Sequence, residues 1–584
     1  MIKKHNCLAN KLNRHLALKL CLIILVSLAS LGCLNASEPE KGALENTQEN
    51  TVEVQILAIN DLHGQLEPST GKVVTGYNKT GSPISVDSGG MGYLAAHIKE
   101  LSSGNPNTLV VSAGDSMGAS PLLSALFHDE PTIKALNMMG LDFSAVGNHD
   151  LDEGVDELMR IQNGGCYTTD GNLSNSSFEG AHFQFLAANI VNESTNTTIF
   201  PAYNITYVQG IPIGFIGVAL KDTPYIVTAS KVKGLRFLDE VETINEQVRK
   251  LKSMGVKTIV VIIHDGGSQK GLYNESLNMS SPILNVINAT DDEVDVFITG
   301  HTHQAYNAVI DGRLVTEAGS SGNLLTDIDL VISNETCDVI EEKSRNIIVS
   351  RDVPEDAGVS ELIKEYKSQV APLANRVIGN ITKNITKTGS DSGESSLGDV
   401  IADAQLYATS NSSNGGAVIA FTNSGGIRAD LVYNQLSGNE LPGQVTYGEA
   451  FSVQPFGNDL VTMTLNGTQI DALLEQQFDN PSPGSKRVLQ ISKGFSYTWN
   501  KSAPTGEKVD ISSIKINGTS IDPSSPYRVT VNSFLADGGD NFSVMKEGID
   551  RTVVGSTDLD AFVDYLTAFS PIAPGSEKRI VLEK

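Results

Sequence analysis

The sequence predicts an α/β protein with a layered first domain, a linking helix and a second, mixed α/β domain. Three observations favour this fold class. Short apolar runs alternate with amphipathic stretches over the first half of the chain, as in sheets covered by helices. After about residue 350 a helical pattern intervenes, and glycine turns and aromatic residues then replace the earlier pattern. The 584 residues are also too many for one hydrophobic core.

The first residues have the pattern of a secretory signal. Five basic residues precede the apolar run 20–31, which is too short to cross a bilayer comfortably. Residues 1–34 therefore predict export to an extracellular, cell-surface or periplasmic location, and the polar, acidic residues 35–50 predict a flexible spacer. Ser30-Leu31-Gly32-Cys33 resembles a lipobox, although Ser30 stands where leucine is usual. A lipid anchor through Cys33 and ordinary small-residue cleavage both stay open.

The charge balance limits the partners of the folded chain. Lys+Arg total 42 against 68 Asp+Glu, a formal net charge of -26. This balance disfavours a nucleic acid polymer or an anionic membrane surface as a partner. An anionic substrate would need local cations, for which metal ions are the obvious source. Beyond the signal only Cys166 and Cys337 remain, which excludes a disulfide framework and a zinc ribbon.

Side chains of metal-binding types follow five predicted strands within residues 51–350, where we expect the first domain. The strands are the apolar runs 52–59, 108–113, 141–146, 258–263 and 294–299. The side chains that follow them are Asp61 and His63, Asp115, Asn148 and His149, His264, and His301 and His303. The stretches 93–101 and 241–254 predict helices between strands. Because functional groups gather at the carboxyl ends of strands in α/β sheets, we expect one site along one sheet edge.

These residue types suit a pair of divalent metals. Two such ions about 3.5–4 Å apart acidify a water molecule and neutralise a phosphoryl group during displacement. The pair needs a bridging carboxylate, and neutral nitrogen or amide ligands keep the total negative charge low enough for an anionic substrate. Asp61 and His63 are two residues apart, so on an extended strand end they would point to the same side.

In this order and spacing, the five motifs resemble the calcineurin-like metallophosphoesterases, specifically the secreted 5'-nucleotidase and UDP-sugar hydrolase family. The resemblance covers the chain from about residue 52 to its end, and it implies a four-layer sandwich with two divalent ions, Zn, Mn, Co or Mg. It implies one ion held by Asp61, His63 and His303, a second held by Asn148, His264 and His301, and Asp115 as the bridge. His149 would be catalytic, stabilising charge on the phosphoryl group and protonating the leaving oxygen.

The family orients this histidine with an aspartate three residues further on. The matching position is Asp152, while Asp150 replaces a family glutamate and is expected to be structural.

The second half predicts a linking helix and a nucleotide-binding domain. Residues 351–372 contain apolar positions at helical spacing and end at Pro372; residues 373–584 form the second domain, with helices at 396–409 and 467–477. Three further segments resemble the substrate-binding segments of the family. They imply that Asn423 contacts the base region, Arg428 the phosphate, Phe456 and Phe534 the two faces of the base, and Asp540 the ribose hydroxyls. The alternative is that both phenylalanines belong to the core.

One segment departs from the family. Residues 391–399 contain no arginine where members commonly have one to hold the phosphate, and Ser396 and Asp399 replace asparagines. Arg428 is therefore expected to be the only guanidinium in the substrate pocket.

The function expected from the resemblance is that of an exported, divalent-metal-dependent 5'-nucleotidase, releasing nucleoside and phosphate for scavenging. Hydrolysis of UDP-sugars or 2',3'-cyclic nucleotides remains an alternative within the family. A non-catalytic extracellular nucleotide-binding protein, which keeps the aromatic rings and has lost hydrolysis, is an alternative of another class.

Overall fold

The computed structural model describes residues 50–68, 72–167, 178–280, 282–436, 438, 440–481, 483–575 and 578–583. The predicted signal sequence, Cys33 and nearly all of the predicted spacer lie outside these residues. Among the helices in the described ranges, none is long and apolar enough to cross a membrane. Cys166 and Cys337 are not joined by a disulfide.

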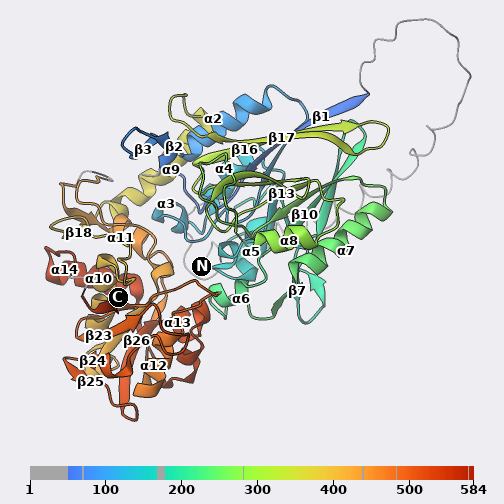
Figure 1. Ribbon diagram of the computed structural model, residues 1–584. Helices are drawn as coiled ribbons and strands as arrows, with labels where there is room; N and C mark the ends of the chain where they lie inside the picture. The colour runs from blue at the N-terminus through green and yellow to red at the C-terminus, as the bar shows by residue number, and fades with distance from the viewer. Residues whose placement is uncertain are drawn as a thin grey trace, which may run out of the picture.

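Two six-stranded sheets form the centre of the first domain, at the upper right of Figure 1. The first sheet has the order β17 (Val339–Ile348), β16 (Leu324–Ser333), β1 (Thr51–Ile59), β4 (Thr108–Ser112), β5 (Phe143–Ala145) and β6 (Gln184–Leu186). The second has the order β14 (Ala305–Ile310), β15 (Arg313–Ala318), β13 (Val296–Ile298), β12 (Thr258–Ile263), β10 (Ile211–Val218) and β9 (Tyr203–Val208). The strands β1, β4 and β5 run parallel, as do β12 and β13, so their carboxyl ends lie at common edges.

Helices cover the outer face of each sheet. α2 (Met91–Ser102), α4 (Glu130–Met139) and α5 (Val155–Asn163) share a core with the first sheet, and α7 (Glu240–Ser253) and α8 (Ile283–Ala289) share one with the second. Successive residues of β1 face opposite sides: Ile56 packs between the two sheets, whereas Leu57 packs beneath the helices. The four layers confirm the predicted fold class.

Smaller elements complete this domain. They are the hairpin β2 (Lys72–Tyr77) and β3 (Pro83–Asp87), the sheet of β11 (Leu235–Phe237), β7 (Ile190–Asn192) and β8 (Thr197–Thr198), and the short helices α3 (Leu122–Ala125) and α6 (Thr223–Ile226).

One long helix, α9 (Ala357–Ala374), leads to the second domain. It begins at Asp356, whose side chain accepts hydrogen bonds from the backbone N–H groups of Gly358 and Val359. Tyr366 and Val370 pack it against the core of the first domain. Pro372 lies inside the last turn and the helix continues to Ala374, because a proline removes only the hydrogen bond of its own missing N–H to the preceding turn and leaves the residues after it free to stay helical.

The second domain is mixed α/β, which also agrees with the predicted fold class. Its main sheet has the order β22 (Gln490–Ile491), β19 (Ile419–Thr422), β26 (Pro526–Asn532), β21 (Asp459–Asn466) and β27 (Ile549–Thr557). Two smaller sheets comprise β25 (Thr519–Ser520), β24 (Lys515–Ile516), β23 (Phe495–Asn500) and β28 (Ile580–Glu583), and β18 (Val377–Asn380) with β20 (Gln444–Thr446). Its helices are α10 (Ser396–Thr409), α11 (Tyr447–Val453), α12 (Gly467–Glu475), α13 (Ser533–Ala536) and α14 (Asp558–Phe569).

A buried carboxyl in α10 predicts a pH-dependent stability. Asp399 is fully buried, 3.5 Å from the Nε of Arg579, and burial raises its pKa to about 8 although Arg579 opposes the shift. Since this pKa is higher in the folded than in the unfolded protein, the carboxyl stabilises the fold at low pH and this contribution is lost as the pH rises through about 8. Asp399→Asn, which cannot ionise, should therefore show a smaller fall in the free energy of unfolding between pH 6 and 9.

Urea unfolding at several pH values measures this difference. Asp564→Asn, an exposed change on α14, serves as the control and should follow the wild type. Parallel curves for the wild type and Asp399→Asn would contradict the expectation.

Candidate dimetal site

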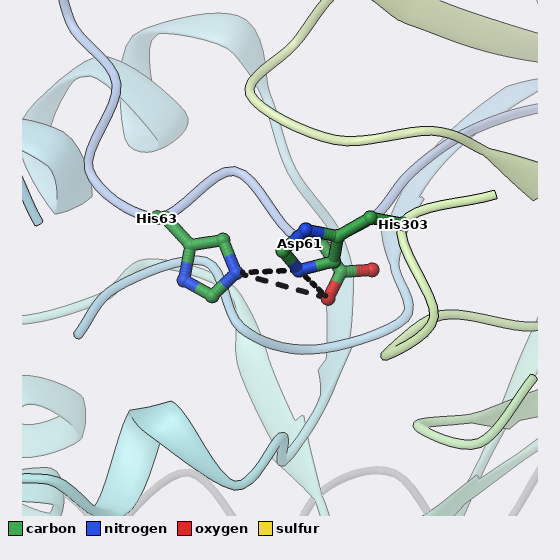
Figure 2. A group of neighbouring side chains, drawn as sticks. All are labelled: Asp61, His63 and His303. Atoms are coloured by element: carbon green, nitrogen blue, oxygen red, sulfur yellow. Dashed lines mark hydrogen bonds and ion pairs between the residues drawn. The ribbon is translucent and has the colours of Figure 1, made fainter. Parts of the chain in front are cut away.

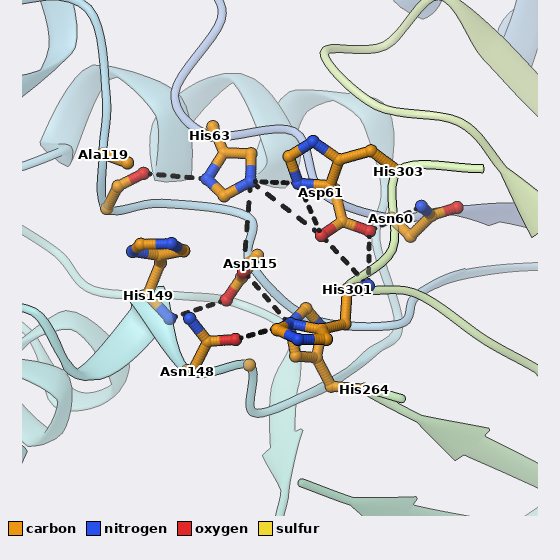
Figure 3. Close-up of polar contacts among 12 residues, drawn as sticks. Asn60, Asp61, His63, Asp115, Ala119, Asn148, His149, His264, His301 and His303 are labelled. Carbon is orange, nitrogen blue, oxygen red and sulfur yellow. Dashed lines mark hydrogen bonds and ion pairs between the residues drawn. The ribbon is translucent and has the colours of Figure 1, made fainter. Parts of the chain in front are cut away.

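All seven side chains predicted as metal ligands meet at one edge of the paired sheets (Figure 3). Five strands deliver them. Asp61 and His63 follow β1, Asp115 follows β4, Asn148 follows β5, His264 follows β12, and His301 and His303 follow β13. The parallel order of these strands explains why residues as distant in sequence as His63 and His303, 240 positions apart, lie side by side.

The first group consists of Asp61, His63 and His303 (Figure 2). The Nε2 atoms of the two histidines lie 3.0 Å apart, and His303 Nε2 lies 3.3 Å from Asp61 Oδ1. His63 Nδ1 lies 3.0 Å from the backbone oxygen of Gly118, so its N–H donates there and Nε2 faces the group with a lone pair. Burial lowers the pKa of His63 to about 3, which keeps this imidazole neutral. A carboxylate and neutral imidazole nitrogen facing one point suit a divalent cation.

The second group combines Asp115, Asn148, His264 and His301. His264 donates its Nδ1–H to the backbone oxygen of Ala113 at 2.7 Å, and its Nε2 lies 3.1 Å from both Asp115 Oδ2 and Asn148 Oδ1. His301 Nδ1 lies 2.9 Å from the same amide oxygen. This set again offers imidazole nitrogen, an amide oxygen and a carboxylate to one point.

Asp115 lies between the two groups. Its Oδ2 is 3.1 Å from His264 Nε2 and 3.9 Å from His63 Nε2. Burial alone would lower the pKa of His264, but the carboxylates of Asp115 and Asp61, together with the hydrogen bond to Ala113, raise that pKa to about 10. The position therefore strongly favours positive charge, and the donor set fits two divalent cations that share one carboxylate.

The backbone at the site is unusual. Asp61, His63, Asp115, His301 and His303 have φ angles of 48°, 49°, 50°, 72° and 55°. Left-handed conformations are uncommon for residues other than glycine and concentrate at functional sites. The expectation that Asp61 and His63 converge by strand alternation is therefore wrong, because β1 ends at Ile59 and a left-handed turn brings them together.

Asp150 and Asp152 have different surroundings. The carboxylate of Asp150 accepts backbone N–H groups from Gly147 at 2.8 Å, Asp115 at 3.1 Å and Met117 at 3.3 Å. It thus fastens the loop after β4 to the loop after β5. Asp152 Oδ2 instead accepts the Nδ1–H of His149 at 2.9 Å. Asp152, and not Asp150, is therefore the aspartate that contacts the His149 ring, as the resemblance implied.

A cavity of about 740 Å³ opens from this edge towards the second domain. Its walls contain the predicted catalytic and substrate-binding residues, namely His149, Asp152, Asn423, Arg428, Phe456, Phe534 and Asp540. The ring of Phe456 stacks on His149, with centroids 5.7 Å apart and an interplanar angle of 19°. Phe456 and Phe534 are both only partly buried; Phe534 also packs against the core of the second domain, so the core alternative is weakened only for Phe456.

Two residues at the site were missed from the sequence. Arg487 lies in the cavity wall and forms an ion pair with Asp540, so the expectation that Arg428 is the only guanidinium there is wrong. Glu317 is buried on β15 and accepts hydrogen bonds from Thr302 Oγ1 at 2.8 Å and the Gln304 N–H at 2.9 Å. It holds the loop that carries His301 and His303. Neither residue belongs to a motif, so only the three-dimensional arrangement identifies them.

The layered sandwich and its paired Asp/His groups define a metallophosphoesterase hydrolase. The calcineurin-like phosphoesterase family matches residues 54–305, and the 5'-nucleotidase C-terminal domain matches residues 377–547. The chain belongs to the 5'-nucleotidase family, which confirms the resemblance.

Individual relatives agree with this placement. Endonuclease YhcR of Bacillus subtilis is 33% identical over 94% of this chain, which covers 43% of YhcR. Cell wall protein Lmo0130 of Listeria monocytogenes is 31% identical over 93% of this chain and 70% of its own length. The crystal structure of the 5'-nucleotidase precursor from Thermus thermophilus has a TM-score of 0.72 at 26% identity, covering 91% of this chain and 99% of that one. Since one relative is named an endonuclease, the expectation of no nucleic acid partner finds no support among them.

The donor set predicts complete dependence on divalent metal. Protein treated with a chelator should lose hydrolysis of p-nitrophenyl phosphate, because the clustered carboxylates and imidazoles alone cannot neutralise a phosphoryl group. Adding back Zn²⁺, Mn²⁺, Co²⁺ or Mg²⁺ should restore it, with metal content followed by mass spectrometry. Full activity in protein shown to be free of metal would contradict the assignment.

Proposed function

We propose that the protein is an exported 5'-nucleotidase that converts a nucleoside 5'-monophosphate into nucleoside and phosphate. The observation that carries this proposal is one cavity that contains His149 at the Asp/His groups and two phenylalanine rings of the second domain. A nucleotide with its phosphate beside the Asp/His groups and its base between the two phenylalanine rings would occupy both ends of this cavity at once.

We assign one cation to Asp61, His63 and His303 and the other to Asn148, His264 and His301, with Asp115 shared. When bound, two divalent cations draw electron density from the phosphoryl oxygens and make water more acidic. As metal ligands the histidines would be neutral and would add no negative charge to the set, which favours an anionic substrate.

His149 is assigned to the leaving oxygen. Its ring lines the substrate cavity, and Asp152 holds its Nδ1–H, which directs Nε2 towards the cavity. Burial alone would lower the pKa of His149, but Asp152 and Asp115 raise it above its ordinary value, so the ring readily carries a proton. In the reaction a water oxygen bonds to phosphorus, the bond from phosphorus to the nucleoside oxygen breaks, and His149 protonates that oxygen.

The second domain is assigned to nucleoside recognition. Phe456 and Phe534 would stack on the base, which is worth about 1–3 kcal/mol per base and tolerates different bases. Arg428 would contact the phosphate, Asn423 the base region, and Asp540 the ribose hydroxyls. Asn423 Nδ2 already donates to Asp540 Oδ2 at 3.1 Å, so the two polar groups are fixed in relation to each other.

The same site is also compatible with two other hydrolytic reactions and with one function of a different class, nucleotide binding without catalysis. UDP-sugar and 2',3'-cyclic nucleotide hydrolysis need the same metals and base contacts. A nucleotide-binding protein without catalysis would need only the second domain, and the full set of Asp and His side chains then has no purpose. The hydrolase interpretation is therefore the stronger one.

Export and the division of the chain are parts of the proposal. Residues 1–34 would direct export, residues 35–50 would separate the fold from the signal or from a lipid on Cys33, and 51–350, 351–372 and 373–584 would be the catalytic domain, linker helix and nucleotide-binding domain. The apolar run after basic residues supports export, as does a relative named as a cell wall protein.

Asp152→Asn tests the role of the His149 pair. The change should lower kcat by about a hundredfold, the lower part of the range for general acid–base catalysis, because the amide no longer holds a protonated imidazole. Metal content should stay as in the wild type. Asp150→Ala should behave differently and lose metal, since three backbone N–H groups lose their acceptor.

Steady-state kinetics with AMP and metal analysis measure both changes. Asp156→Asn, an exposed change on α5, is the matched control. Wild-type turnover in Asp152→Asn would remove the assignment.

Phe534→Ala tests the substrate. Loss of one stacking surface should raise KM for AMP by about fivefold or more and leave p-nitrophenyl phosphate unaffected, because that substrate has no base to stack. A panel of AMP, UMP, UDP-glucose and 2',3'-cyclic AMP, with products separated by chromatography, ranks the reactions. Equal effects on both phosphate esters would argue against base recognition at this ring.

A further inference from the structure

One peptide group lies between the Asp/His groups and the His149 pair. It joins Gly118 to Ala119 in the loop after β4. Its oxygen, on Gly118, accepts the Nδ1–H of His63 at 3.0 Å. Its N–H, on Ala119, donates to Asp152 Oδ2 at 3.0 Å, and the same oxygen accepts the Nδ1–H of His149 at 2.9 Å. Because a peptide group is planar, one rotation of it would disturb both sides at once.

The backbone on either side of this peptide is left-handed. The φ angles of Gly118 and Ala119 are 79° and 48°. This conformation costs an alanine roughly 1–2 kcal/mol, so it persists only where the surroundings hold it. A Cβ on Gly118 would collide with the backbone oxygen of His149, so the loop after β5 supports the peptide on one side.

Asp129 supports the peptide from a second direction. It is buried, and its Oδ2 accepts the Gly118 N–H at 3.1 Å. Asp129 precedes α4, where an aspartate usually accepts a hydrogen bond from the first helical turn, but its side chain makes no such bond. Its other oxygen faces the loop after β1, since a Cβ on Gly64 would come within 2.8 Å of Oδ1. The carboxyl group therefore lies against both the His63 loop and the peptide that His63 contacts.

The turn that carries Asp129 is itself held in an uncommon conformation. His128 and Asp129 have φ angles of 51° and 59°, and two successive left-handed residues other than glycine are uncommon. His128 Nδ1 lies 2.8 Å from an oxygen of Glu153, the residue after Asp152. The turn is thus tied to the loop after β4 by Asp129 and to the segment after Asp152 by His128.

We propose that Asp129 is a positioning residue, which sets the Gly118–Ala119 peptide so that His63 and the Asp152–His149 pair are oriented together. The inference rests on the proposed function for the roles of His63 and His149. Without the Asp129 carboxyl, the Gly118 N–H loses its acceptor and the peptide is free to rotate. His63 then loses the carbonyl that fixes its tautomer, and Asp152 loses a donor that fixes its carboxylate.

A purely structural role for Asp129 is the alternative, and Asp142 offers a matched control for it. Asp142 Oδ2 accepts the Val110 N–H of β4 at 2.8 Å, so this aspartate also provides one acceptor to the backbone of the same chain segment. It has no contact with the His63 or Asp152 side chains among its hydrogen bonds to described residues. Asp142→Ala should therefore lower the melting temperature and leave metal affinity and the relative rates on different substrates unchanged.

The test uses full-length protein with saturating Mn²⁺. Asp129→Gly removes the carboxyl group, and glycine suits the left-handed backbone. It should lower kcat for AMP by about tenfold, the lower end of the range for groups that orient metal ligands, and weaken Mn²⁺ binding in titration calorimetry by a similar factor. The fall in kcat should be smaller for p-nitrophenyl phosphate, whose leaving oxygen needs little protonation.

Asp129→Asn should restore values near the wild type. Its amide oxygen can still accept the Gly118 N–H, and asparagine tolerates the left-handed backbone. If Asp129→Gly does not fold, Asp129→Ser takes its place, because the serine hydroxyl is one bond shorter and does not reach Gly118. The same losses are then expected.

The outcomes separate the two roles. An unchanged Mn²⁺ affinity, or equal falls of kcat on the two esters, would overturn the joint positioning, as would an Asp129→Asn protein as impaired as Asp129→Gly. A lower melting temperature alone, as in Asp142→Ala, would leave only the structural role. No hydrolysis of AMP by the wild type defeats the proposed function, whereas the Mn²⁺ titrations of the Gly and Asn variants still decide whether Asp129 orients His63.

Discussion

The shared carboxylate of Asp115 is the interaction on which the rest of the site depends. It lies within 3.1 Å of His264 and 3.9 Å of His63, and its other oxygen accepts the backbone N–H of His149 at 2.7 Å. One side chain therefore contacts both groups and the loop that carries His149. With Asp61 it also concentrates negative charge in a buried place, which is costly unless cations are bound there. The parallel strands and the left-handed turns that follow them serve to bring these charges together.

The sequence predicts the parts of this site that depend on local pattern. Apolar runs bounded by polar residues located the strands, and Asp61, Asp115 and His264 could be placed because each follows such a run. The left-handed backbone at Asp61 and His301 could not be predicted, since nothing in either residue type requires it. The roles of Arg487 and Glu317 could not be predicted for another reason. Their partners, Asp540 and Thr302, are brought to them by the packing of the folded chain, and no characteristic sequence spacing marks these pairs.

The position of the second domain matters as much as the ligands. α9 packs on the first core through Tyr366 and Val370 and contacts α11 of the second domain, so it helps to fix where the residues proposed to bind the substrate lie. Phe456 then stacks on His149, and the guanidinium of Arg428 lies 5.7 Å from the centroid of the Phe456 ring. The cavity has walls from both domains. Under the proposed function, substrate choice would therefore be determined where the domains meet.

The overall charge limits how large that substrate can be. A formal charge of -26 repels phosphates at a distance, whereas Arg428, Lys387 and divalent cations held by the Asp/His groups would attract them within a few ångströms. Screening over about 8 Å at physiological ionic strength separates these two ranges. The proposed mononucleotide would place all its charge beside these local cations. A longer chain would carry further phosphates beyond these local cations, where the net negative charge of the protein disfavours them.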